Sequence, residues 1–97
     1  MDGPDEVIHQ STRLKIAATL NTLGQKEMLD FGQLKAMLDT SDGNLATHLA
    51  ALERAEYVAI TKDFVGKKPR TRVQLTPKGR RALRGHVAYL RSIIEGL

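Results

Sequence analysis

The sequence contains no cysteine and no tryptophan, and only 4% of its residues are aromatic. The absence of cysteine excludes disulfides and thiolate metal ligands, and it fits a reducing compartment such as the cytoplasm. No run approaches the roughly 18 apolar residues of a membrane span. The acidic residues 1–6 are also unlike the apolar part of a secretory signal. We therefore expect a cytoplasmic protein that makes no contact with membranes.

The chain is 97 residues long and 41% hydrophobic, which predicts a single folded domain over residues 1–97. Its charge is distributed unevenly. Residues 1–63 contain six Lys and Arg against ten Asp and Glu, whereas residues 64–97 contain nine against Glu95 alone. A basic segment of this kind favours a polyanionic partner, and nucleic acid is the first candidate. A basic surface that is merely solvated is the alternative.

Helix start signals recur along the first half of the chain. Ser11 is the expected N-cap of a first helix. Asp30 and Gln33 have the spacing of a capping box, which predicts the start of a second helix. Ser41 is the predicted cap of a third. Because only about three residues separate the second helix from the third, we expect a helix-turn-helix over residues 30–55.

The third helix has the pattern of a recognition helix that enters the DNA major groove. Its leucines recur at i, i+4 and i+7 and must face the core, so the opposite side is open. Base contacts come mostly from the first turns of such a helix. Asp42, which phosphates would repel, either complements the helix dipole or accepts a hydrogen bond from a cytosine amine. The candidate DNA-binding residues are Ser41, Gly43, Asn44, Thr47 and His48.

Each candidate has a chemical role available. Asn44 can pair with adenine through two hydrogen bonds, and Thr47 can bond to a base or contact a thymine methyl group. Gly43 allows close approach of the backbone, while Ser41 and the first N–H groups of the helix can bind a phosphate. His48, between the packed and open sides, is a lesser candidate.

After residue 56 the sequence changes from a helical to a strand period. Residues 57–61 are rich in strand-forming side chains, with Val58 and Ile60 on one side, and residues 71–75 alternate between the two faces of a strand. Residues 64–70 between them contain Gly and Pro and are predicted to be a loop. We expect a β-hairpin, or wing, over residues 57–75. Its cations would follow the DNA backbone or enter the minor groove, with a merely polar loop as the alternative. These cations are Lys67, Lys68, Arg70 and Arg72.

The last helix is predicted over residues 77–95, because Thr76 and Pro77 are a typical helix start. Its apolar residues are spaced 4, 3, 4 and 3 apart, which is the pattern of a helix-pairing seam. We expect a homodimer in which residues 7–8 also take part; the alternative is a helix that folds back on the first helix. The predicted interface consists of Leu83, Val87, Leu90 and Ile94, with Leu97 continuing the pattern.

Several segments resemble a known family. Residues 13–16 (RLKI) resemble the first-helix signature of ArsR- and MarR-type regulators. Residues 40–49 (TSDGNLATHL) and 52–58 (LERAEYV) look like their recognition helix and first wing strand, and residues 64–71 (FVGKKPRT) and 75–80 (LTPKGR) match the wing and its exit. The resemblance implies a winged helix-turn-helix, mainly α with a small β-hairpin, that binds double-stranded DNA and regulates transcription.

The chain also departs from these families. It lacks the cysteines of metal-sensing ArsR proteins and the extra helices with which MarR proteins build a ligand pocket, so we expect no metal and no cofactor and leave any small-molecule effector open. No nucleophile elbow, phosphate loop or acid–base pair is present, so we expect no catalytic residues and no enzyme. We predict a dimeric, sequence-specific DNA-binding repressor. The alternatives are a winged-helix adaptor for protein–protein interaction and a non-specific nucleic-acid-binding protein.

Overall fold

The computed structural model describes residues 3–97 and contains four helices and three strands. It confirms the predicted winged helix, mainly α with a small antiparallel sheet. Within this part of the chain, no helix is long and apolar enough to cross a membrane. The elements follow one another as α1 (Ser11–Asn21), β1 (Leu29–Asp30), α2 (Phe31–Leu38), α3 (Asp42–Arg54), β2 (Val58–Val65), β3 (Lys68–Leu75) and α4 (Pro77–Glu95).

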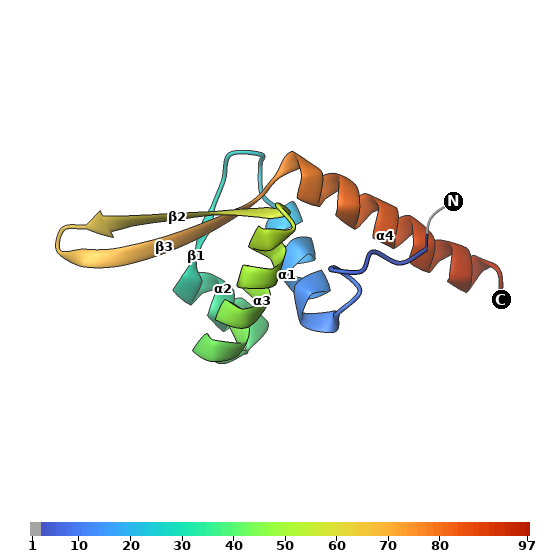
Figure 1. Ribbon diagram of the computed structural model, residues 1–97, viewed down its shortest axis with the longest axis horizontal. Helices are drawn as coiled ribbons and strands as arrows, with labels where there is room; N and C mark the ends of the chain where they lie inside the picture. The colour runs from blue at the N-terminus through green and yellow to red at the C-terminus, as the bar shows by residue number, and fades with distance from the viewer. Residues whose placement is uncertain (1–2) are drawn as a thin grey trace.

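The molecule is 54 Å long and 25 Å wide because two elements project from its helical body in opposite directions (Figure 1). The β2–β3 hairpin, which we call the wing, extends to one side. The second half of α4 extends to the other. Helices α1, α2 and α3 form the body between them.

The core lies where the three body helices meet the base of the sheet and the first half of α4. Burying a large aliphatic side chain contributes roughly 1.5–3 kcal/mol, so a core without aromatic residues still stabilises a chain of this size. Ile8 is completely buried, so the expectation that residues 7–8 join a dimer interface is wrong for this residue. The largest fully buried side chains are Ile8, Ile16, Leu20, Leu34, Leu45, Leu52, Val73 and Leu75.

The sheet has the strand order β1-β3-β2, and both pairs are antiparallel. The short strand β1 places Leu29 opposite Val73 and Asp30 opposite Arg72. The sequence showed only a short apolar step here, because two residues are too few to display a strand period. Pairing with β1 covers β3 at its base and leaves the outer part of the wing as a two-stranded ribbon.

The predicted N-caps Asp30, Ser41 and Thr76 are confirmed, and each side chain accepts a hydrogen bond from the backbone N–H three residues on. The prediction for Ser11 is wrong. Gln10 caps α1 instead, and its side-chain oxygen accepts the corresponding hydrogen bond at 2.9 Å. The helix thus begins one residue earlier than predicted, and Ser11 is its first residue.

Two contacts fix the direction in which α4 leaves the body. Gly79 lies against the carbonyl oxygen of Tyr57 so closely that a Cβ atom would be 2.2 Å from that oxygen. Further along, the backbone N–H of Asp5 donates to Nδ1 of the buried His86 at 3.1 Å, and the hydroxyl of Tyr57 donates to the Asp5 carboxylate at 2.7 Å. Burial and this bond raise the pKa of Tyr57 to about 12, so the hydroxyl remains a donor at neutral pH.

The close approach at Gly79 gives a stability prediction. Gly79→Ala is expected to lower the free energy of unfolding by about 1–3 kcal/mol, because the methyl group must displace a backbone carbonyl. Gly85→Ala, in the same helix with nothing within 4 Å, is expected to raise it by up to about 1 kcal/mol, since Ala favours helix. Urea unfolding at one protein concentration measures both. Equal stability of the Gly79→Ala variant and the wild type would contradict this packing.

Candidate nucleic-acid interface

Helix α3 has one packed and one open side. Its three leucines are buried, as the sequence predicted. The N-cap Ser41 is exposed, and its hydroxyl accepts a hydrogen bond from the backbone of Asn44 at 3.1 Å. The first turns of α3 are therefore ordered by their own cap and accessible to a ligand. The exposed polar side chains on these turns are those of Asp42, Asn44 and Thr47, beside the exposed Gly43 and Ala46.

The polar groups on the open side are held by local hydrogen bonds. The amide nitrogen of Asn44 donates to the hydroxyl of Thr40 at 2.7 Å, and the hydroxyl of Thr47 donates to the carbonyl of Gly43 at 2.9 Å. The first bond uses one of the two amide hydrogens of Asn44. The other hydrogen and the carbonyl oxygen form the donor–acceptor pair that adenine requires in the major groove.

Two further groups border this side of α3. Asp42 forms an ion pair with Lys35 of α2 at 2.8 Å, which offsets its repulsion of phosphates. Nδ1 of the half-buried His48 accepts a hydrogen bond from Nε of Arg13 at 3.2 Å. Burial and the Arg13 charge lower the pKa of His48, so the ring is neutral at pH 7. With Nδ1 accepting, the neutral ring carries its proton on Nε2 as a donor.

The two strands of the wing are longer than predicted. Strands β2 and β3 pair along their whole lengths of eight residues each, so most of residues 64–70 form strand rather than loop. Only Gly66 and Lys67 lie in the turn, where the φ of +63° at Gly66 fits a two-residue hairpin turn. Pro69 is tolerated because β3 has only one neighbouring strand at this position.

One carboxylate holds two of the predicted wing cations. The guanidinium of Arg70 donates to both oxygens of Asp63, at 2.9 and 2.8 Å, and that of Arg72 donates to one of them at 2.9 Å. The hydrogen bonds from Arg70, together with the charges of both arginines, lower the pKa of Asp63 to about 2. The carboxylate is therefore ionised at physiological pH. Both arginines are half-buried.

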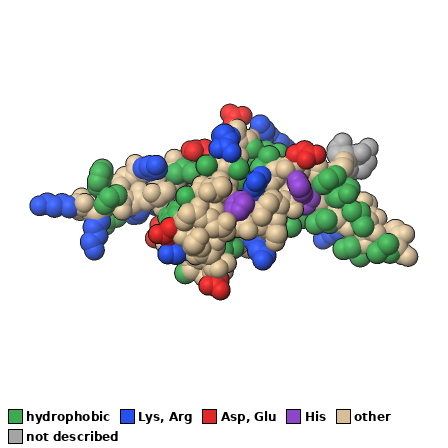
Figure 2. All heavy atoms as spheres, turned by 60° about the horizontal axis from the view of Figure 1, so that its bottom comes forward, with side chains coloured by type: hydrophobic (Ala, Val, Ile, Leu, Met, Phe, Trp, Pro, Cys, Tyr) green, Lys and Arg blue, Asp and Glu red, His purple; other side chains and the backbone are tan. Residues whose placement is uncertain are grey.

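The other wing cations, Lys67, Lys68 and Lys62, are exposed, and Figure 2 shows basic side chains at this end of the molecule. Among residues 3–97, none of the three takes part in an ion pair. Lys62 is absent from the sequence prediction because the first strand was expected to end at residue 61. Continuing the alternation to Val65 would have placed Lys62 on the exposed ribbon.

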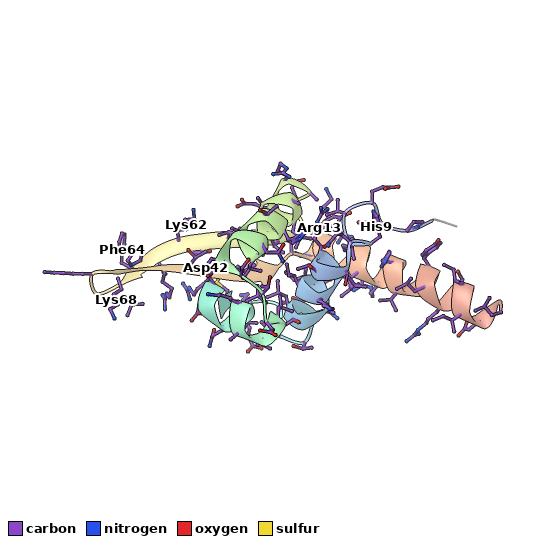
Figure 3. All side chains as sticks on the ribbon, turned by 90° about the horizontal axis from the view of Figure 1, so that it is seen from below. His9, Arg13, Asp42, Lys62, Phe64 and Lys68 are labelled. Carbon is purple, nitrogen blue, oxygen red and sulfur yellow. The ribbon has the colours of Figure 1, made fainter. Side chains whose placement is uncertain are left out.

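The wing and α3 share one side of the molecule. A shallow groove between them is lined by Ala46 and Ala50 of α3 and by Lys62 and Thr71 of the wing, among others. Figure 3 shows Lys62 on the side of the wing toward α3, together with Phe64, while Lys68 points to the other side. Lys62 and the open side of α3 therefore form one continuous surface.

The predicted seam of α4 is divided between the core and solvent. Leu83 is 5% exposed and packs in the core of its own chain, and Val87 packs partly against that core. Leu90 is half-buried, whereas Ile94 is 68% exposed. The first half of α4 thus folds back on the body and the second half is uncovered, where Figure 2 shows hydrophobic side chains gathered opposite the wing.

No three His, Asp or Glu side chains in the described range are placed to hold a metal ion. The surface that the structure does provide is one of hydrogen-bonding side chains at a helix start, exposed lysines on a ribbon, and an uncovered apolar helix face.

Comparisons with known proteins agree with this geometry. An uncharacterized protein of Methanocaldococcus jannaschii is 33% identical over 82 residues, which cover 84% of this chain and 86% of that protein. The structure of a transcriptional regulator homologue from Pyrococcus horikoshii superposes with a TM-score of 0.84 at 28% identity, over 95% of this chain and 88% of that one.

A MarR-family protein from Porphyromonas gingivalis shares the fold over the full length of both chains, with a TM-score of 0.70 and 19% identity. The fold is that of transcriptional regulators, which are not enzymes. The sequence model of the winged helix DNA-binding domain matches residues 12–94, which is most of the chain. The protein therefore belongs to the family of winged helix DNA-binding domains.

Proposed function

We propose that this protein binds double-stranded DNA sequence-specifically as a homodimer and represses transcription. The observation that carries the proposal is the open side of α3, which presents Asn44 and Thr47 next to a wing with exposed lysines. An α-helix fits the major groove, where each base pair has its own pattern of donors and acceptors. A dimer bound across a promoter represses by occupying it.

Within this proposal, some residues of the interface contact bases and others contact phosphates. Asn44 and Thr47 read base edges, and Gly43 allows the helix start to approach them. Ser41 and the backbone N–H groups around it bind a phosphate, as helix starts do for anions. His48 supplies Nε2–H as a further donor at the edge of the interface. Such phosphate contacts position the helix, and the base contacts specify the sequence.

The wing supplies most of the electrostatic affinity. Lys62, Lys67 and Lys68 are exposed and reach phosphates directly. Arg70 and Arg72 keep the ribbon ordered through Asp63, and their remaining N–H groups, apart from the buried Nε–H of Arg72, are available for contacts to DNA phosphates.

The second half of α4 forms the dimer interface in this proposal. Ile94 is largely exposed and Leu90 half-buried, and Leu97 beyond the helix is fully exposed. Pairing with the same face of a second copy covers this stripe, and two-fold pairing is the usual arrangement for homodimers. It would place two recognition helices about one DNA turn apart, on a palindromic site.

The base-reading role of α3 is tested by Asn44→Ala. Its exposed position predicts little effect on folding. Loss of a two-bond contact to adenine costs about 1–3 kcal/mol of discrimination at one base pair per half-site. Competition between operator duplexes with single base changes measures the preference. A variant that prefers the same base as strongly as the wild type would contradict direct reading by Asn44.

A further inference from the structure

The tip of the wing carries an apolar side chain that the fold does not use. Phe64 is 68% exposed, although the chain has only two phenylalanines and the other, Phe31, packs against the core. The exposure follows from the length of the wing, which carries β2 well beyond the body (Figure 1). Phe64 contributes no core packing, so its apolar surface is available to a partner.

The register of the hairpin decides which way Phe64 points. Residues two apart in a strand share a face, so Phe64 lies on the face of Ile60 and Lys62. Ile60 and Lys62 line the groove against α3, and Figure 3 shows Phe64 on the same side as Lys62. Pro69 lies directly opposite Phe64 on β3. The α3 side of the wing therefore ends in an apolar pair.

The charges around this pair identify the partner. Lys62 precedes Phe64 by two residues, Lys67 lies in the turn and Lys68 begins the next strand, all exposed. The carboxylate of Asp63 lies on the opposite face, where it is occupied by Arg70. An exposed apolar side chain with Lys62 on its own face, Lys67 in the turn and Lys68 on the opposite face is complementary to a nucleic-acid groove, which has an apolar stack of bases between two rows of phosphates.

We propose that Phe64 is a wedge that the wing inserts into the DNA minor groove, partly unstacking one base step and bending the duplex. The inference rests on the proposed function, since it requires α3 to be in the neighbouring major groove. Apolar wedges of this kind bend DNA by about 20–90°. They favour pyrimidine–purine steps, which unstack most easily, so Phe64 adds sequence preference at a position that no hydrogen bond reads.

The test uses the duplex selected by the wild-type protein, with a dye at each end for energy transfer and 2-aminopurine at successive positions outside the α3 contacts. We expect the wild type to raise both energy transfer and 2-aminopurine fluorescence at one step. Phe64→Ala is expected to remain bound but to abolish the local fluorescence rise and most of the bend, and Phe64→Leu to restore part of both.

Val65→Ala is the matched control, because Val65 is 56% exposed on the same strand but on the opposite face. It should bend and unstack the duplex as the wild type does. Phe64→Ala with an unaltered bend and fluorescence rise would overturn the wedge and leave the DNA-binding function standing. If Phe64→Ala bends and unstacks the duplex normally but no longer binds another protein, the wedge is likewise overturned and the DNA-binding function stands. Failure of the wild type to bind any duplex would overturn both.

Discussion

Replacing Lys62, Lys67 and Lys68 together by alanine is expected to weaken DNA binding by about 10- to 1,000-fold at physiological salt. These three side chains are the exposed cations of the wing, and each phosphate that they neutralise releases condensed counterions from the duplex. The slope of log K against log salt should therefore become shallower by about 0.9 for each phosphate that a protomer no longer neutralises. Titrations of one operator duplex at several salt concentrations measure both quantities.

The control removes the same charge elsewhere. Lys26, Arg81 and Arg84 are exposed, and they lie outside the wing and α3. Changing all three to alanine alters the net charge equally but removes no cation that the proposal places on a phosphate. Its salt slope should stay close to that of the wild type. If the two triple variants have the same slope, overall charge rather than the wing governs binding.

Ile94→Glu is expected to convert the dimer to monomers. Ile94 is 68% exposed in one chain, and the proposal buries it against the same face of a second chain. An unpaired carboxylate buried in such an interface costs about 3–5 kcal/mol, which corresponds to more than a hundredfold increase in the dimer dissociation constant. Sedimentation equilibrium over a range of protein concentrations measures this constant.

Ser92→Glu provides the comparison, because Ser92 is exposed on the opposite side of α4. This variant introduces the same charge without entering the apolar stripe, so it should remain dimeric. Ile94→Glu should also lose operator affinity, since two linked half-sites bind far more tightly than one. A dimer that persists in the Ile94→Glu variant would remove α4 from the interface.

Local signals in the sequence predicted the body of the fold well. The capping pair Asp30 and Gln33 and the Thr76–Pro77 start are contained in a few neighbouring residues, so no tertiary information is needed to recognise them. The open side of α3 followed from the spacing of its leucines, because residues at i, i+4 and i+7 share one side of any helix. Asn44 and Thr47 could thus be identified as exposed candidates.

Features that depend on pairing between distant residues were not predictable in the same way. Strand β1 exists because β3 offers it a partner, and β2 continues past residue 61 because β3 remains paired with it. The pairing of Asp63 with Arg70 and Arg72 depends on that register. Lys62 and Phe64 were missed for the same reason.

The heptad pattern on α4 was ambiguous in the sequence for a different reason. A heptad pattern indicates that a helix face is covered, but it does not say whether the chain's own core or a partner covers it. Leu83 is covered by the core of its own chain and Ile94 is not. The fold-back interpretation therefore holds for the first half of α4, and for the uncovered second half the dimer stays a prediction.

A dimer of this protein that reads a defined DNA sequence through α3 is the centre of the proposed function. Selection of the purified wild-type protein on a random duplex library, read by sequencing, tests it most directly. We predict an enriched palindrome whose half-sites are centred about 10 base pairs apart. Salt-sensitive binding without any enriched motif, or no binding to duplex DNA at all, would contradict it.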